Sequence, residues 1–131
     1  MTKILYVEDD HDDVDILKEA TRETKVGLEI IHAIDGFEGL ELCERHRGRL
    51  SLILIDMNLP RMNGLEFLTT IKRDGHHCSK TPAVIFTTSA TPGIKEKAIE
   101  LGAIDFLIKP TSFPAYCNIV TTIYSRSLRQ A

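Results

Sequence analysis

The chain has 131 residues, of which 43% are hydrophobic and 27% are charged, and its formal net charge is −3. This length predicts one domain with a single core, and the acidic balance excludes a general basic surface for nucleic acid or for an anionic membrane. Since no signal peptide or membrane-length apolar run is present, and the three widely spaced cysteines (Cys43, Cys78 and Cys117) fit reduced thiols, we expect a cytoplasmic location.

Short apolar runs alternate with helix-period segments along the chain. The runs are rich in Ile, Val, Leu or Phe, which is typical of parallel strands buried on both faces. They are Ile4–Val7, Ile30–Ala33, Leu52–Ile55, Ala83–Phe86 and Phe106–Ile108. The predicted helices between them are Asp10–Glu23, Phe37–His46, Leu65–Arg73 and Ile94–Leu101. A last helix is predicted from Phe113 to Tyr124, where apolar residues share one helical face and Ser112 and Pro114 suit its start.

This alternation predicts an α/β fold with a parallel sheet, helices on both faces and right-handed crossovers. In such a sheet, ligands bind beyond the carboxyl ends of the strands. The residues that follow each apolar run are therefore the first place to look for a functional site.

Polar side chains follow four of the five predicted strands. They are Glu8, Asp9 and Asp10 after the first strand, Asp56 and Asn58 after the third, Thr87, Thr88 and Ser89 after the fourth, and Lys109 after the fifth. The second strand is followed only by Ile34-Asp35-Gly36, which is typical of a turn into a helix. Because the carboxyl ends of parallel strands meet at one edge, we expect the other four groups to converge.

The chemistry of these residues favours a metal-assisted phosphoryl site. Glu8, Asp9 and Asp56 would repel one another in a shared pocket, and a divalent cation removes that conflict. Oxygen ligands without His or Cys indicate a hard ion such as Mg²⁺. The Thr87 hydroxyl and the Lys109 ammonium suit phosphoryl oxygens. Asp56, the single acid at the central strand's end, is the candidate nucleophile for an aspartyl phosphate.

Each residue also has an ordinary structural interpretation. Asp9 or Asp10 could cap the first helix, Thr87 could be a loop hydroxyl, Lys109 a surface lysine and Asp56 a turn residue. Their joint occurrence at four strand ends favours the site.

Other acids and histidines are interpreted as structural or surface residues. Asp12, Asp13 and Asp15 are predicted to form a solvated first-turn face favoured by the helix dipole. His76, His77 and Cys78 could suggest a metal, but adjacent positions seldom both ligate one ion. His32 carries no functional signal.

Four segments resemble the response-regulator receiver domain of two-component signalling, over nearly the whole chain. They are ILYVEDD (4–10), LILIDMNLPRMNG (52–64), VIFTTSA (84–90) and FLIKP (106–110). The resemblance implies a flavodoxin-like doubly wound (βα)₅ fold with a five-stranded parallel sheet in the order 2-1-3-4-5, the strand order of the chemotaxis regulator of this family. The DGHHCSKT loop and the TTS triplet are similar to single-domain regulators associated with phytochrome or hybrid histidine kinases.

The resemblance also implies a role for each matching residue. Asp56 would accept a phosphoryl group from a histidine kinase or phosphotransfer protein, and Thr87 and Lys109 would bind its oxygens. The implied Mg²⁺ ligands are Glu8 (through water), Asp9, Asp56 and the backbone carbonyl of Asn58. Thr87 and Phe106 would form the switch, with Phe106 where many members have Tyr. Gly64 would open the third helix, the Lys109–Pro110 bond would be cis, and Asn58 and Ser89 would flank the path of the attacking water.

The sequence thus predicts a single receiver domain over residues 1–131 with no output domain. It would catalyse only its own phosphoryl transfer and dephosphorylation. Its output would be contact between the face of helix four, strand five and helix five and a downstream protein, or phosphorelay, without nucleic acid or membrane partners. Apolar residues of helices four and five offer a surface for a homodimer, although core packing explains most of them.

Two alternatives remain open. One is a receiver-like scaffold that binds partners without phosphorylation, although the intact Asp9, Asp56, Thr87 and Lys109 argue against it. The other is an aspartate-nucleophile phosphohydrolase on a similar sheet. It is disfavoured because the acid pair comes first in this chain and position 58 is Asn rather than Asp.

Overall fold

The computed structural model describes residues 1–88 and 90–128, in which strands and helices alternate. The strands are β1 (Thr2–Val7), β2 (Leu28–Ala33), β3 (Leu52–Ile55), β4 (Ala83–Thr87) and β5 (Asp105–Ile108). The helices are α1 (His11–Thr24), α2 (Gly36–Arg45), α3 (Gly64–Ile71), α4 (Ile94–Glu100) and α5 (Phe113–Ser127). The strands pair in parallel in the order β2-β1-β3-β4-β5, which confirms the predicted doubly wound α/β fold.

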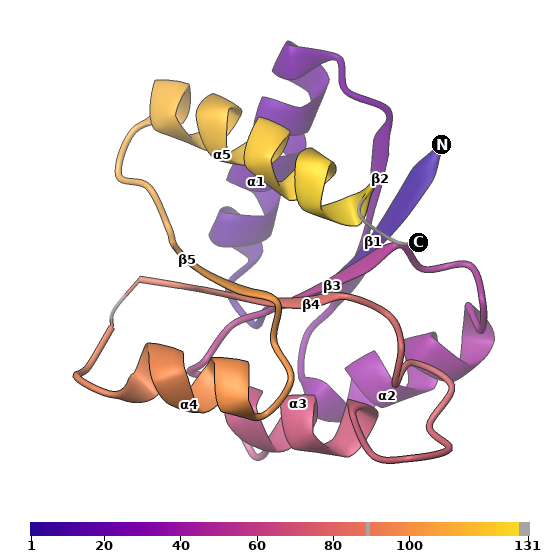
Figure 1. Cartoon of the computed structure of the whole chain (residues 1–131). Coiled ribbons are helices and arrows are strands. Elements are labelled where there is room, and N and C mark those ends of the chain that lie inside the picture. Colours follow the sequence, from indigo (N-terminus) through magenta and orange to yellow (C-terminus); the bar gives the residue numbers. More distant parts are fainter. Residues whose placement is uncertain (89, 129–131) are drawn as a thin grey trace.

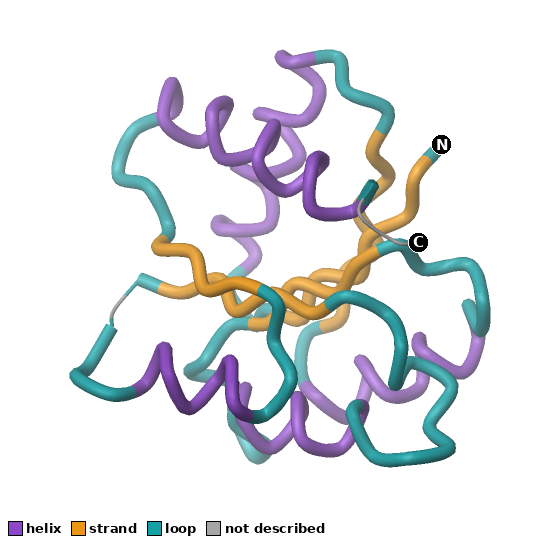
Figure 2. The backbone as a smooth tube through the Cα atoms, in the orientation of Figure 1, coloured by secondary structure: helices purple, strands orange, loops and turns teal. Residues whose placement is uncertain are grey.

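The sheet lies between two helical layers, with α1 and α5 on one face and α2, α3 and α4 on the other (Figures 1 and 2). Successive side chains of β1 point alternately to the two faces of the sheet. Leu5 and Val7 belong to the core cluster on the α2 side, and Ile4 and Tyr6 belong to the cluster on the α1 side. Because both faces are covered, β1, β3 and β4 are apolar without a polar alternation.

Local capping fixes where the helices begin. Asp10 caps α1 by accepting a hydrogen bond from the Asp12 backbone N–H, which confirms one of the two structural interpretations of the acids after β1. Asn63 and Glu66 form a capping box at the start of α3. Ser112 accepts from the Ala115 N–H at the start of α5, as the sequence predicts. These caps satisfy backbone N–H groups in the first turns of α1, α3 and α5.

The predicted elements all exist, and their ends differ from prediction by a few residues. β1 and β2 each begin two residues earlier than their apolar runs, and α2 and α3 each begin one residue earlier than predicted. No helix in the described part of the chain has the length and apolarity needed to span a bilayer.

Candidate functional site

Three carboxylates meet at the carboxyl ends of β1 and β3. Val7 of β1 lies opposite Ile55 of β3, so the residues that follow each strand are neighbours. Ligand oxygens of Glu8, Asp9 and Asp56 all lie within 4.8 Å of one another. Glu8 and Asp56 are buried and Asp9 is exposed. Carboxylates at this spacing repel, and an oxygen donor set open to solvent on one side fits a hard divalent ion such as Mg²⁺.

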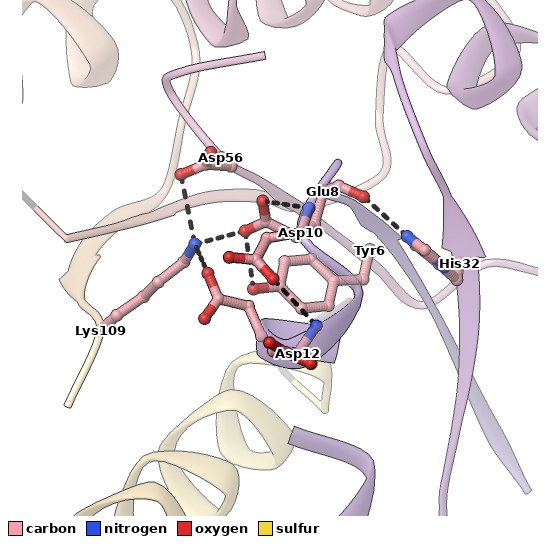
Figure 3. A network of polar contacts seen from close by, with 8 residues as sticks. Tyr6, Glu8, Asp10, Asp12, His32, Asp56 and Lys109 are labelled. Atoms are coloured by element: carbon pink, nitrogen blue, oxygen red, sulfur yellow. Dashed lines mark hydrogen bonds and ion pairs between the residues drawn. The ribbon is translucent and has the colours of Figure 1, made fainter. Parts of the chain in front are cut away.

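Lys109 brings a single buried positive charge to these acids (Figure 3). Its Nζ donates a hydrogen bond to Glu8 Oε1 and another to Asp13 Oδ2 at 2.7 Å, and it lies 3.5 Å from Asp56 Oδ1. Burial alone would lower the pKa of Lys109, but the hydrogen bonds to Asp13 and Glu8 outweigh it and raise that pKa above its usual range. The ammonium is therefore held charged in front of Asp56.

Glu8 is held by groups from several elements. The Tyr6 hydroxyl donates to its Oε1 at 3.2 Å, and the Asp10 N–H donates to its Oε2 at 3.2 Å. His32 Nε2 lies 2.6 Å from the Glu8 carbonyl oxygen, and because that oxygen can only accept, Nε2 carries the proton. Burial raises the pKa of Glu8 to about 7, the Asp56 charge adds to the rise, and Lys109 opposes it.

Thr87 is a fully buried hydroxyl at the end of β4. Its Oγ1 has no hydrogen-bond partner among the described residues, while its carbonyl oxygen accepts from the Lys109 N–H at 2.7 Å. Buried side-chain hydroxyls are seldom left unpaired, so this one is available to an incoming acceptor. Phe106 lies on β5 opposite Ile85 and is 8% exposed, with its side chain in the core cluster on the α2 side of the sheet.

The loop between β3 and α3 passes very close to Asp56. The Gly64 N–H donates to the Met57 carbonyl at 3.0 Å. A Cβ on Gly64 would collide with the Asp56 carbonyl oxygen and lie 2.9 Å from Met57 Cα. Glycine is therefore required where α3 opens, in agreement with the role predicted for Gly64. Asn58 is exposed in this loop, and Ser89 lies outside the described residues.

Asp13 is a site residue that the sequence analysis assigned wrongly. It was predicted to be part of a solvated face with Asp12 and Asp15, yet its carboxylate is half-buried and bonds Lys109 across 96 positions of the chain. It follows the Asp10 cap by one helical turn, which is the only sequence signal that sets it apart from its acidic neighbours.

His32, to which the sequence analysis gave no function, lies beside the site: its Nε2 contacts the Glu8 carbonyl oxygen, and its ring lies edge-on to His11 with ring centroids 5.2 Å apart. One further expectation needs correction. The Lys109–Pro110 bond was predicted to be cis, and residues 1–88 and 90–128 contain no cis peptide bond. The trans form is the one that X–Pro bonds favour intrinsically, by about 0.5–1 kcal/mol.

The chain is similar to known proteins over most of its length. The family model of the response regulator receiver domain matches residues 4–121. The transcriptional regulatory protein PcoR of Escherichia coli is 30% identical over 131 residues, which are 100% of this chain and 55% of PcoR. The uncharacterized transcriptional regulatory protein YcbL of Bacillus subtilis is 36% identical over 110 residues, which are 82% of this chain and 44% of YcbL. The chain thus spans about half the length of these relatives.

Solved structures match the whole fold. The Mn²⁺-bound form of the response regulator Rcp1 superposes with a TM-score of 0.83 and 27% identity, covering 100% of this chain and 97% of Rcp1. The phosphorylated cyanobacterial phytochrome response regulator RcpA gives 0.82 and 29%, covering 99% and 96%. Receiver domains are phosphoacceptors in two-component signalling and are generally not enzymes. The matched segment, the 2-1-3-4-5 sheet and the acids, threonine and lysine at its edge together show that this chain belongs to the response regulator receiver domain family.

Proposed function

We propose that this protein is a response regulator that accepts a phosphoryl group on Asp56 from a histidine kinase or a phosphotransfer protein. The observation that carries the proposal is the position of Lys109, whose buried ammonium lies 3.5 Å from Asp56 Oδ1 beside the clustered oxygens of Glu8, Asp9 and Asp56. A charged donor and an excess of carboxylates at one edge suit a metal-assisted transfer to a carboxylate.

The residues of the chain have separate roles in this transfer. Asp56 attacks the phosphorus atom, and the bond between phosphorus and the histidine nitrogen of the donor breaks. Lys109 and the Thr87 hydroxyl, which has no hydrogen-bond partner among the described residues, donate hydrogen bonds to the phosphoryl oxygens. Glu8, Asp9, Asp56 and the Asn58 carbonyl would hold Mg²⁺, which supplies charge neutralisation when bound. Rcp1 with Mn²⁺ and RcpA in its phosphorylated form support this assignment by analogy.

The output would pass through the face formed by α4, β5 and α5. Thr87 ends β4, and its carbonyl oxygen accepts a hydrogen bond from the Lys109 N–H just after β5. A shift of Thr87 toward a phosphoryl group would therefore displace β5 and the Phe106 side chain on it. β5 is an edge strand, and Ile99, Ile104 and Ile108 are each more than 40% exposed around it. This apolar surface fits a downstream protein or a second copy of the chain.

We also propose that residues 1–131 act as a single receiver domain of the type associated with phytochrome-like or hybrid kinases. Support comes from Rcp1 and RcpA, since this chain covers nearly all of both. The free cysteines of the described residues fit a cytoplasmic location.

Intact-protein mass spectrometry after incubation with Mg²⁺ and acetyl phosphate tests the proposal. We expect one phosphoryl adduct on the wild type, none on Asp56→Asn, and an unchanged adduct on Asp12→Asn. The last is a matched control at an exposed acid whose side chain has no hydrogen bond or ion pair to the described residues, and whose backbone N–H bonds the Asp10 cap in either variant.

An equal adduct on Asp56→Asn would remove Asp56 as acceptor. No adduct on the wild type would favour the phosphorylation-independent scaffold. Steady hydrolysis of p-nitrophenyl phosphate, abolished in Asp56→Asn, would favour the phosphohydrolase alternative.

A further inference from the structure

The Lys109 ammonium lies among three carboxylates at unequal distances. Its Nζ donates hydrogen bonds to Glu8 Oε1 and to Asp13 Oδ2, the second at 2.7 Å, whereas Asp56 Oδ1 lies 3.5 Å away. The distance to Asp56 is longer than the usual N–H···O hydrogen bond of about 2.7–3.2 Å. Figure 3 shows these contacts meeting at the Lys109 nitrogen. The carboxylate proposed to take the phosphoryl group is thus the one of the three that the ammonium does not hydrogen-bond.

Asp13 reaches this cluster from a different kind of element than the other two acids. Glu8 and Asp56 follow the strands β1 and β3, whereas Asp13 lies in the first turn of α1. The buried side chain of Val14 beside it belongs to the core cluster on the α1 side and fixes this turn against the sheet. Among the described residues, Lys109 is the only hydrogen-bond or ion-pair partner of the Asp13 carboxylate. The one polar contact that Asp13 makes is therefore directed at the site.

The ammonium depends on these acids because it is buried. The Lys109 side chain is only 3% exposed, and a buried charge without a hydrogen-bonded partner is costly. An ammonium has three N–H donors, and Glu8 and Asp13 each accept a hydrogen bond from it. Without the Asp13 acceptor, the next carboxylate is that of Asp56 at 3.5 Å. A small movement of the flexible lysine side chain would then bring the ammonium into hydrogen-bond contact with Asp56.

A hydrogen bond from Lys109 to Asp56 would hinder phosphoryl transfer. It would occupy an oxygen that is needed to bind the metal or to attack the phosphorus atom. It would also stabilise the carboxylate before the reaction, whereas only interactions that are stronger in the transition state speed the chemical step.

We infer that Asp13 is a positioning residue, which keeps the Lys109 ammonium from closing on Asp56 and so leaves that carboxylate open to Mg²⁺ and to a phosphoryl donor. The inference rests on the proposed function. With acetyl phosphate as donor, an Asp56 oxygen attacks phosphorus, the bond between phosphorus and the acetyl oxygen breaks, and acetate leaves with the electron pair. Asp13 forms and breaks no covalent bond in this step and acts only through Lys109.

The rate of phosphorylation separates this role from two others. Loss of a residue that only stabilises α1 would leave the rate unchanged, and loss of an acid that only repels the anionic donor would raise it. We expect Asp13→Ala to lower the rate several-fold at saturating Mg²⁺ and Asp13→Glu to restore most of it, measured by intact-protein mass spectrometry over time. Asp15→Ala should react as the wild type does. It is the matched control, because Asp15 is an exposed acid of α1 whose side chain has no hydrogen bond or ion pair to the described residues.

Calorimetric titration with Mg²⁺ gives a second readout that needs no phosphorylation. Asp13→Ala should bind Mg²⁺ several-fold more weakly than the wild type, because the ammonium then occupies an oxygen of Asp56. In the Lys109→Met background, Asp13→Ala should change the Kd no more than Asp15→Ala does, since no ammonium is left to move. This double-mutant cycle measures whether Asp13 acts through Lys109.

The inference is overturned if Asp13→Ala is phosphorylated at the wild-type rate or faster, if Asp15→Ala slows the reaction equally, or if Asp13→Ala weakens Mg²⁺ binding equally with and without Lys109. Urea unfolding checks that each variant is folded. If Asp13→Ala is not, Asp13→Asn takes its place, because it keeps an uncharged acceptor, and it should move both readouts in the same direction by less. A wild type without an adduct would overturn the proposed function, and the Mg²⁺ cycle would still test the action of Asp13 on Lys109.

Discussion

Asp35 and Asp56 each follow a strand of the sheet, and each is 5% exposed. Asp35 accepts a hydrogen bond from the Glu38 N–H at 2.8 Å and pairs with Arg61, and it caps α2. The Asp56 carboxylate has one polar partner among the described residues, the Lys109 ammonium at 3.5 Å, and lies beside the carboxylates of Glu8 and Asp9. Equal burial thus accompanies very different degrees of pairing.

The difference separates a structural carboxylate from a functional one. A buried carboxylate whose oxygens are paired stabilises the fold, and its pKa is lowered, as that of Asp35 is by the Glu38 N–H and by Arg61. A buried carboxylate that is crowded by like charges is a cost to the fold, and a cation or a covalent partner relieves that cost. The comparison predicts that the two aspartates respond differently to metal, to substitution and to acid.

Mg²⁺ should produce the largest difference. A cation that binds only the folded protein at about 100 times its Kd adds about 2.7 kcal/mol to the free energy of unfolding. We expect a gain of this order for the wild type and for Asp35→Asn, and a much smaller gain for Asp56→Asn. Urea unfolding in Mg²⁺ and in EDTA measures the gain for each protein. An equal gain in Asp56→Asn would show that the cation binds elsewhere.

Loss of the Asp35 side chain should destabilise the protein. Asp35→Ala removes the helix cap of α2, which typically costs about 0.5–2 kcal/mol. Asp35→Asn is the matched control, because it keeps an acceptor for the Glu38 N–H and loses only the charge, at a cost of about 0.3–1 kcal/mol. Urea denaturation of the three proteins orders their stabilities, and an Asp35→Ala as stable as the wild type would contradict the cap.

The Asp56→Asn substitution should change the free energy of unfolding in the opposite direction, as a gain in stability. Without divalent cation, Asp56→Asn removes a charge that repels Glu8 and Asp9 and leaves Lys109 paired with Glu8 and Asp13. We expect a gain of about 1 kcal/mol in the free energy of unfolding, the scale of the repulsion between two unit charges about 4 Å apart in water. The measurement is urea unfolding in EDTA. A loss of stability would mean that the Lys109 attraction outweighs the repulsion.

The same comparison shows how far the sequence alone could lead. Apolar runs without polar alternation predicted every strand. The acids, threonine and lysine that follow four of these strands predicted which edge of the sheet carries the site. Both predictions succeed because they depend only on local sequence and on the rule that ligands bind at the carboxyl ends of parallel strands. Asp35 was interpreted only as a turn, since its partner Arg61 lies 26 positions away. Arg61 itself has a φ of +64°, a conformation that a residue other than glycine seldom adopts.

Long-range partners account for the remaining differences. Asp12, Asp13 and Asp15 are alike in sequence. Only the packing of α1 against the sheet places the Asp13 carboxylate within hydrogen-bond distance of Lys109. Patterns of burial can be read from neighbouring residues, whereas the choice among equivalent polar residues is made by the tertiary structure.

The pH dependence of the Asp35 contribution should be the smallest of these effects. Its pKa is lowered below the ordinary 3.8 in the folded protein, so its contribution to stability is fully present above about pH 5 and is lost as the pH falls through the folded value. The difference in unfolding free energy between the wild type and Asp35→Asn should therefore be constant near neutral pH and shrink below about pH 4. Urea unfolding of both proteins across this range measures it. A difference that stays constant into strong acid would mean that Asp35 acts through its shape and its hydrogen-bond acceptor alone, and that its charge adds nothing to the cap.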